Sequence, residues 1–248
     1  MKIYLGCSSY QNFLWKGIFY PEDLPEKQWF GFYSDHFNTF EINATFYKFP
    51  TLRVMQNWYN RAPLDFVYSV KAPKVITHTK RFIDCMDELT VFYDVCREGL
   101  QEKLGCILFQ LPPSFDYSDE RLDLILQLLD SSYNNVVEFR HLSWWRDDVF
   151  QSLDIHRISF CSVGYPNLPE EIKVTAQKGY IRFHGNERLF YSGYSEQKLF
   201  EAYTQFQNAD NTAEIYIYFN NTASAEGILD AIKMQKITAA GGKKITGS

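Results

Sequence analysis

Three segments of the sequence alternate apolar residues with charged or polar ones and finish in groups that could do chemistry. They are the segments 40–43 (Phe-Glu-Ile-Asn), 137–141 (Val-Glu-Phe-Arg-His) and 181–184 (Ile-Arg-Phe-His). Alternation with a period of two gives a β-strand one apolar face and one charged face. Carboxylates, guanidinium groups and imidazoles on one face are the groups used for acid–base catalysis and for binding anions. The segments therefore predict a functional site as well as strands.

The register of these segments separates the side chains that pack from those that face the site. In a closed parallel barrel, alternate residues point to the axis and to the surrounding helices, and the helix-facing ones must be apolar. The residues expected to face the helices are Phe40, Ile42, Val137, Phe139, Ile181 and Phe183. With the ends of three further strands included, the inward polar set is Glu41, Asn43, Lys71, Gln110, Glu138, Arg140, Arg182, His184 and Asn220.

The charge of this polar set indicates an anionic ligand. Lys71, Arg140 and Arg182 contribute positive charges, Glu41 and Glu138 contribute negative ones, and one positive charge is left over. A positive site in a protein of net charge -5 suits a phosphate or a carboxylate, held by lysine or by forked arginine donors. The predicted substrate-binding residues are Lys71, Arg140, Arg182, Asn43, Gln110 and Asn220.

Acid–base chemistry on such a ligand needs a proton acceptor and a proton donor. We assign Glu41 or Glu138 as the general base and His184 or His78 as its acid partner. His78 follows the third strand in a loop, whereas His184 has the inward register and also fits a hydrogen-bonded core residue. The sequence thus predicts an enzyme that acts on a phosphorylated or other anionic small molecule.

Other interpretations of the same residues stay open. The glutamates could neutralise the arginines in a closed ion-pair network, or act as the paired carboxylates of a glycosidase. A non-catalytic ligand-binding protein would keep the pocket without turnover. If Arg182 serves the ligand, replacing it with alanine should weaken anion binding far more than stability.

A divalent metal is a further alternative, as in a metal-dependent phosphodiesterase or a sugar-transforming barrel. The candidate ligands are Glu41, Glu138, His141 and His184. Metal-binding barrels usually gather more carboxylates than cations, and here the arginines and the lysine would repel the ion. We therefore predict no metal ligands and no cofactor.

The elements that position these residues alternate along the chain. Period-two patterns predict strands near residues 3–8, 39–43, 66–71, 106–110, 136–140, 158–162, 180–184 and 214–220. Between them, apolar residues recur at helical spacing, for instance after the expected N-caps Ser118, Ser195 and Thr222. Eight β/α units in 248 residues predict one α/β domain, a (β/α)8 TIM barrel of parallel strands with an outer ring of helices. It should span residues 1–238, followed by a disordered tail at 239–248.

Composition limits the class of protein and its partners. Hydrophobic residues make up 46% and charged residues 22% of the chain, as in a globular domain with a sizeable core. The net charge of -5 argues against binding to membranes and makes nucleic acid a weaker partner than a small molecule. No apolar run approaches a membrane span and no signal peptide precedes the first strand, which predicts a cytoplasmic protein. The five scattered cysteines lack CxxC spacing, so we expect buried, reduced thiols.

The loop from residue 8 to residue 25 is rich in aromatic side chains, including Trp15, Phe19 and Tyr20. Long loops after barrel strands line the catalytic mouth, so these rings could form a wall for a sugar or a base. A lid that packs on its own domain is the alternative.

Ordered motifs recur over nearly the whole chain, up to about Met234. They are residues 6–10 (GCSSY), 15–21 (WKGIFYP), 40–47 (FEINATFY), 71–73 (KAP), 77–78 (TH), 109–115 (FQLPPSF), 138–144 (EFRHLSW), 180–185 (YIRFHG) and 218–221 (YFNN). Together they resemble the YecE-like family, a domain of unknown function. The resemblance implies a TIM barrel and carries no assigned activity. Cys7, Tyr10, Ala44 and Asp230 stand where that family more often has Thr, Trp, Ser and Asn.

Overall fold

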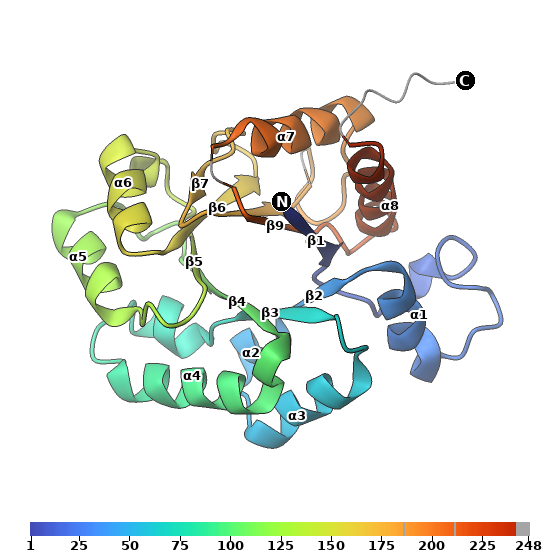
Figure 1. Cartoon of the computed structure of the whole chain (residues 1–248), viewed down its shortest axis with the longest axis horizontal. Coiled ribbons are helices and arrows are strands. Elements are labelled where there is room, and N and C mark those ends of the chain that lie inside the picture. Colours follow the sequence, from blue (N-terminus) through green and yellow to red (C-terminus); the bar gives the residue numbers. More distant parts are fainter. Residues whose placement is uncertain (186, 211, 242–248) are drawn as a thin grey trace.

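Eight parallel strands close into a barrel. The structure is a computed structural model that describes residues 1–185, 187–210 and 212–241. The barrel strands are β1 (Lys2–Cys7), β2 (Thr39–Ile42), β3 (Val67–Lys71), β4 (Leu104–Gln110), β5 (Asn135–Glu138), β6 (Ser159–Gly164), β8 (Lys178–Phe183) and β9 (Glu214–Phe219). Neighbours along the chain pair in parallel, β6 pairs with β8, and β9 pairs with β1 to close the sheet. The predicted TIM barrel is confirmed, and each predicted strand ends within two residues of an observed one (Figure 1).

Helices form an outer ring around the barrel (Figure 1). They are α1 (Trp29–His36), α2 (Ala44–Tyr47), α3 (Leu52–Arg61), α4 (Met86–Leu100), α5 (Asp119–Leu128), α6 (Asp147–Ile155), α7 (Glu196–Asn208) and α8 (Glu226–Ala239). The expected N-caps Ser118 and Ser195 are confirmed, since each hydroxyl accepts a backbone N–H from three residues on. The expected cap Thr222 is wrong, because a turn follows it and the Ser224 hydroxyl accepts the N–H of Glu226 instead (3.2 Å).

One crossover departs from the β/α repeat. Residues 165–177, all of them described, join β6 to β8 without the helix expected in every unit, and they contain the short strand β7 (Val174–Thr175). This strand pairs antiparallel with β8. Pro166 and Pro169 lie in the connection and disfavour a helix there, because proline lacks the N–H that a helix interior needs.

The buried apolar residues form two clusters, one between the strands and the helices and one inside the barrel. The outer cluster joins strand residues to helix residues such as Met55, Leu89 and Ile228. It contains every residue predicted to face the helices, so the predicted register is confirmed: Phe40, Ile42, Val137, Phe139, Ile181 and Phe183. The buried members of the inner cluster all come from strands and are Tyr4, Cys106, Leu108, Val136, Cys161, Val163, Tyr180, Tyr216 and Tyr218.

The aromatic loop between β1 and α1 packs on its own domain, as the lid alternative states. Trp15 and Tyr20 are buried, and Tyr20 stacks on Trp29 with ring centroids 4.8 Å apart. Trp15 Nε1 donates to the carbonyl oxygen of Ser224 (3.0 Å), and Tyr20 Oη donates to that of Tyr10 (2.6 Å). These two rings therefore stabilise the fold and do not form a wall of the site.

Three further predictions concern the cysteines, membrane-spanning helices and the C-terminal tail. All five cysteines are described, buried and free, as predicted. Within the described ranges, no helix is both long enough and apolar enough to cross a membrane. The last helix, α8, ends at Ala239, and residues 242–248 of the predicted tail lie outside the described residues.

The close approach of α3 to α4 depends on Gly99. A Cβ added there would lie 2.2 Å from Cβ of Met55, so we expect Gly99→Ala to lower the free energy of unfolding by about 1–3 kcal/mol. Gly31 in α1 is the matched control, because nothing lies within 4 Å of a Cβ added there. Gly31→Ala should raise stability by roughly 0.5–1 kcal/mol. Urea unfolding measures both variants, and equal effects would contradict the close packing.

Candidate functional site

Arg182 joins two buried glutamates at the carboxyl ends of the strands. Arg182 lies in β8 with 1% of its surface exposed, and Glu41 of β2 and Glu138 of β5 are fully buried. Its Nη2 donates to Glu41 Oε1 (2.7 Å), its Nε to both Glu41 oxygens (3.0 Å each) and its Nη1 to Glu138 Oε2 (2.6 Å). Burying an ion costs several kcal/mol unless its partners are well placed, and these forked bonds supply them. Arg182 therefore ties β2, β5 and β8 together.

Tyrosine hydroxyls support these ion pairs from inside the barrel. Tyr180 Oη donates to Glu41 Oε2 (2.7 Å). Tyr218 Oη lies 2.6 Å from Thr39 Oγ1 and 2.8 Å from Ser69 Oγ. Both oxygens of Glu41 are thus occupied by protein donors, which leaves this carboxylate poorly placed to take a proton from a ligand.

Arg140 completes the pairing of Glu138. Its Nε donates to Glu138 Oε1, and its guanidinium lies 4.1 Å from the ring centroid of Tyr165. Although burial raises the pKa of Glu138, Arg140 and Arg182 outweigh it and hold that pKa well below the usual range. A carboxylate that two arginines keep ionised is a weak proton acceptor. The geometry gives no support to Glu138 as the general base, and it matches the ion-pair alternative.

His184 is a neutral ring that orients Arg140. The ring is fully buried, and Arg140 Nη2 donates to its Nε2 (2.9 Å). Burial, reinforced by Arg140, holds the pKa of His184 well below its usual value. The neutral ring therefore carries its proton on Nδ1, which lies 2.8 Å from the side-chain amide of Asn220. On its other side the same amide accepts a hydrogen bond from the Ser8 hydroxyl, with Oγ 2.5 Å from Asn220 Oδ1.

Lys71 is the one cation of the predicted set without an acidic partner in the described part of the chain. It ends β3, is half-buried, and places Nζ 4.1 Å from the ring centroid of Phe46. Thr45 fixes this arrangement, because its hydroxyl donates to the Lys71 carbonyl oxygen (2.6 Å) and ties α2 to the end of β3. Burial, followed by repulsion from Arg182, lowers the pKa of Lys71 to about 8. Lys71 therefore carries the surplus charge and titrates near neutral pH.

These polar groups surround a cavity of about 490 Å³ at the carboxyl ends of the strands. That volume is typical of sites for small molecules. The cavity is lined by Ser8, Asn43, Tyr47, Lys71, Gln110, Arg140, Arg182, Phe190, Tyr191, Asn220, Thr222 and Ala223. It brings together every predicted substrate-binding residue. Of the predicted catalytic residues, Glu41, Glu138 and His184 lie behind its wall.

His78 packs against Phe46 of α2. It lies on a π-helical turn (Val75–Thr79), with its ring centroid 4.9 Å from that of Phe46 and its Nδ1 2.9 Å from Thr77 Oγ1. Burial, together with Lys71 and Lys74, lowers the pKa of His78 to about 4. The ring is neutral at neutral pH, and it is not among the residues that line the cavity, so its assignment as an acid has no support here.

Sequence reasoning missed the aromatic rim of the cavity. Tyr47, Phe190 and Tyr191 line the cavity and are exposed to solvent. Phe190 has a φ of +68°, which is rare for a bulky residue, and its N–H donates to the carbonyl oxygen of His184 (2.6 Å). Only Tyr47 lies in a recognised motif. Phe190 and Tyr191 lie on the connection between β8 and α7, whose path no period-two or helical pattern reveals.

The donor set does not fit a divalent metal. Among residues 1–185, 187–210 and 212–241, no three His, Cys, Asp or Glu side chains are grouped to hold one. Glu41 and Glu138 already accept from arginines, and His141 Nδ1 lies 2.7 Å from Ser143 Oγ. Because Glu41 and Glu138 are both paired with arginines, they are also poorly placed to act as the two catalytic carboxylates of a glycosidase.

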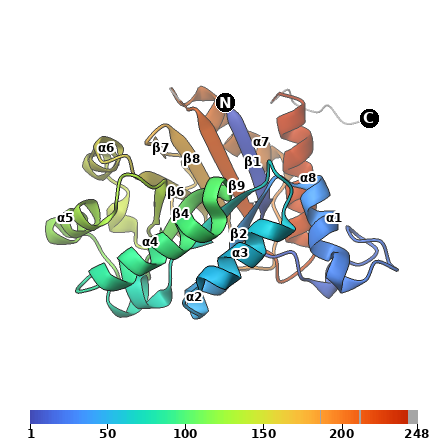
Figure 2. The same ribbon diagram turned by 60° about the horizontal axis from the view of Figure 1, so that its bottom comes forward.

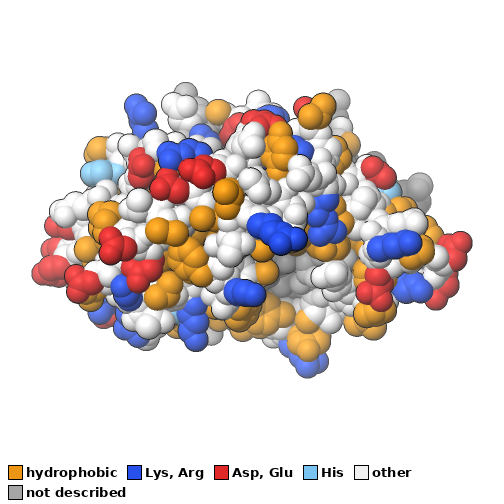
Figure 3. Space-filling model, turned by 90° about the horizontal axis from the view of Figure 1, so that it is seen from below, with side chains coloured by type: hydrophobic (Ala, Val, Ile, Leu, Met, Phe, Trp, Pro, Cys, Tyr) orange, Lys and Arg blue, Asp and Glu red, His pale blue; other side chains and the backbone are white. Residues whose placement is uncertain are grey.

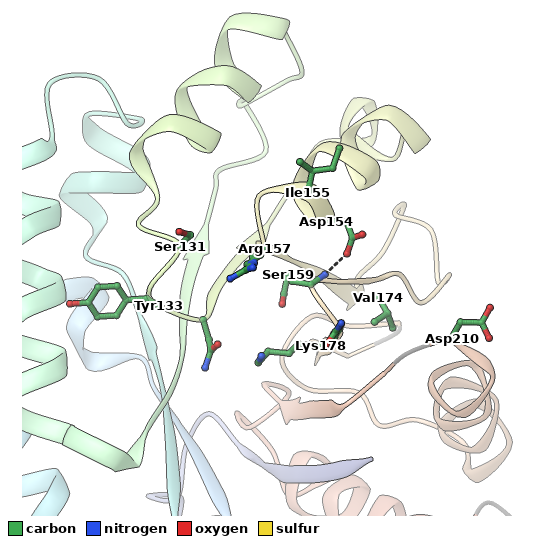
Figure 4. A pocket seen from close by; sticks show the side chains of 12 residues that line it. Ser131, Tyr133, Asp154, Ile155, Arg157, Ser159, Val174, Lys178 and Asp210 are labelled. Carbon is green, nitrogen blue, oxygen red and sulfur yellow. Dashed lines mark hydrogen bonds between the residues drawn. The ribbon is translucent and has the colours of Figure 1, made fainter.

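A larger cavity of about 660 Å³ lies at the opposite end of the barrel (Figure 4). Ser159 and Lys178, which begin β6 and β8, line it, so it faces the amino ends of the strands. Asp154 Oδ1 accepts the backbone N–H of Ala176 there (2.7 Å). In TIM barrels chemistry occurs at the carboxyl end of the strands, and α2 lies towards that end (Figure 2). The cavity around Lys71 is therefore the candidate site.

A closed ring of eight parallel strands with helices around it defines a TIM-barrel protein. The chain belongs to the family described as "Protein of unknown function DUF72", whose model matches residues 4–247. It is 26% identical over 204 residues to UPF0759 protein YunF of Bacillus subtilis, covering 75% of this chain and 71% of that protein. It is 32% identical over 112 residues to UPF0759 protein YecE of Escherichia coli, covering 44% and 40%. The resemblance to the YecE-like family is confirmed.

Solved structures agree with this assignment. The crystal structure of a DUF72 family protein from Thermotoga maritima has a TM-score of 0.84 and 28% identity, covering 96% of this chain and 100% of that one. A DUF72 family protein from Enterococcus faecalis has a TM-score of 0.80 and 20% identity, covering 96% and 95%, and shows the fold alone. None of these descriptions states an activity.

The sequence predicts that Arg182→Ala would weaken anion binding far more than stability. The bonds of Arg182 to two buried glutamates instead lead us to expect a large loss of stability. Arg182→Met leaves Glu41 and Glu138 buried without their shared partner, so we expect the free energy of unfolding to fall by about 3–5 kcal/mol. Arg53→Met in α3 is the control, because Arg53 is exposed, and it should change stability by less than about 0.5 kcal/mol. Urea unfolding at pH 7 decides, and a stable Arg182→Met protein would contradict the network.

The lowered pKa of Lys71 predicts how stability depends on pH. Between about 8 and the ordinary value of 10.5, unfolded chains bind more protons at Lys71 than folded ones, so this group makes stability rise with pH there. Below pH 8 the buried charge destabilises the fold. We expect Lys71→Met to raise stability at pH 7 by up to about 3 kcal/mol and to flatten the rise above pH 8.

Urea unfolding from pH 6 to pH 10, compared between wild type and variant, measures this effect. Lys74→Met is the matched control, since Lys74 is exposed three residues further on and should leave the pH profile unchanged. Identical pH slopes for the wild type and Lys71→Met would show that Lys71 is not desolvated in the folded state.

Proposed function

We propose that the protein is an enzyme that acts on a phosphorylated or other anionic small molecule at the carboxyl end of its barrel. One observation carries this proposal: Glu41 and Glu138 neutralise Arg182 and Arg140, so Lys71 leaves an uncompensated positive charge in the cavity. A half-buried charge of this kind is costly, and an anionic ligand is the partner that offsets it.

The arrangement of the cavity supports a small ligand over an extended polyanion. Lys71 and Arg140 would hold the anion, and Asn43, Gln110 and Asn220 would orient the rest of the ligand. The positive charge of the cavity contrasts with the chain's net charge of -5. The face seen in Figure 3 carries both acidic and basic side chains. The free cysteines support a cytoplasmic location as part of this proposal.

The chemistry that this cavity favours is proton transfer by Lys71. Its pKa of about 8 lies near the working pH, which is where a general acid or base is most effective. Glu41, Glu138 and His184 would then position Arg182 and Arg140 instead of exchanging protons with the ligand.

A non-catalytic binding protein is the second candidate. It is favoured by the engagement of both glutamates and His184 in bonds within the protein. Incubating the protein with phosphorylated sugars and following them by phosphorus NMR separates the two. Conversion that is lost in Lys71→Met supports an enzyme, whereas ligands that bind tightly and stay unchanged support the second candidate.

Sulfate binding tests the anion site, since the charge of sulfate is constant between pH 6 and pH 9. We expect isothermal titration calorimetry to show binding that weakens as the pH rises through about 8, where Lys71 loses its proton. Lys71→Met should weaken binding about tenfold or more, because a charge-assisted bond is lost. Lys74→Met should bind as the wild type does. Equal affinities of the wild type and Lys71→Met would contradict the proposal.

A further inference from the structure

We propose that Lys71 is a nucleophile whose side-chain amine forms an imine with an aldehyde or ketone group of the anionic ligand. This inference rests on the proposed function, because it names carbonyl compounds as the class of anion that the same cavity takes. Lysines act in this way when an apolar surrounding or a neighbouring cation keeps a share of the amine neutral.

The ion pairs around Lys71 keep its amine free of acidic partners. Two carboxylates belong to the same polar layer, yet Glu41 is bound by Arg182, and Glu138 by Arg182 and Arg140. In the described ranges no carboxylate oxygen lies within 4.0 Å of Lys71 Nζ. A lysine kept only for its charge would be stabilised by such a partner, whereas a nucleophile would be inactivated by it.

Burial and the neighbouring arginines favour the neutral form of Lys71. Its Nζ lies over the ring of Phe46 in α2, which keeps water from one side of the amine, and Arg182 and Arg140 repel its proton. The resulting pKa of about 8 leaves roughly a tenth of the amine neutral at pH 7, against less than a thousandth for an ordinary lysine. Phe46 and Thr45, which hold this geometry, come from the same motif that follows β2.

The cavity supplies partners for both ends of such a ligand. Asn43 Nδ2 donates to Glu41 Oε1 (3.2 Å), which fixes the amide and leaves Asn43 Oδ1 buried without a partner among the described residues. Asn43 lines the same cavity as Lys71, and we assign its unpaired oxygen as the acceptor for the hydroxyl of an addition intermediate. Arg140 uses Nε and Nη2 within the protein, so its Nη1 is left for the anionic group of the ligand.

The step needs no oxidant, reductant or metal. The lone pair of neutral Lys71 Nζ forms a bond to the carbonyl carbon while the C=O π electrons move to oxygen. The oxygen takes a proton from nitrogen through solvent to give a carbinolamine. Loss of that hydroxyl with the second nitrogen proton releases one water and forms the C=N bond. The sum is an amine and a carbonyl compound giving an imine and water.

Pyridoxal 5′-phosphate is a suitable probe, because it carries an aldehyde and a phosphate on one small ring. We expect it to react with the full-length protein at pH 7, and borohydride reduction to fix the product as a secondary amine. Peptide mapping by mass spectrometry should find Lys71 modified at least about tenfold faster than exposed Lys74, because a desolvated amine beside cations is a better nucleophile than an exposed one. Sulfate should slow the reaction at Lys71 and not at Lys74.

The variant Lys71→Arg is the control, since it keeps the charge and the anion site but has no amine. It should bind sulfate within about threefold of the wild type and lose the fast modification. Sulfate binding together with equal modification of Lys71 and Lys74 would overturn the imine and leave the anion site standing. Failure of the wild type to bind sulfate would overturn the proposed function itself, so the two failures are distinguishable.

Discussion

The forked ion pair between Arg182 and the buried carboxylates of Glu41 and Glu138 is the interaction on which the site depends. It joins three strands that are far apart in the sequence, and it lies directly above a layer of tyrosine rings and hydroxyls that fills the barrel. Because both glutamates lack solvent, they are stable as ions only while the arginines stay in place. The interaction therefore holds strands of the barrel together and also sets which charges remain unpaired at its carboxyl end.

The unpaired charge of Lys71 determines which ligands the carboxyl end of the barrel favours. With Arg140 and Arg182 neutralised, Lys71 is the one group of the inward set whose charge is unpaired within the described residues and whose pKa lies close to neutral pH. Its placement follows from a short local sequence, because Thr45 ties α2 to β3 and sets the ring of Phe46 against the ammonium group. An arrangement that destabilises the fold is retained most readily where it serves a ligand.

Much of the fold and the membership of the cavity could be predicted from the sequence. Apolar residues such as Phe40 and Ile181 must face helices, and this alone turns Glu41 and Arg182 inward. The roles could not be predicted, because they depend on which carboxylate meets which cation, and Arg182 reaches Glu41 across 141 positions of sequence. The helix missing between β6 and β8 and the rim formed by Phe190 depend on loop paths, for which no periodic pattern exists.

The protonation of Lys71 in the folded protein tests this account most directly. NMR titration of protein with isotope-labelled lysine side chains follows each ammonium group separately from pH 6 to pH 11. The account predicts one lysine, absent from the spectrum of Lys71→Met, with a pKa of about 8. A pKa near 10.5 for that resonance would mean that Lys71 is solvated or paired, and would contradict the central claim.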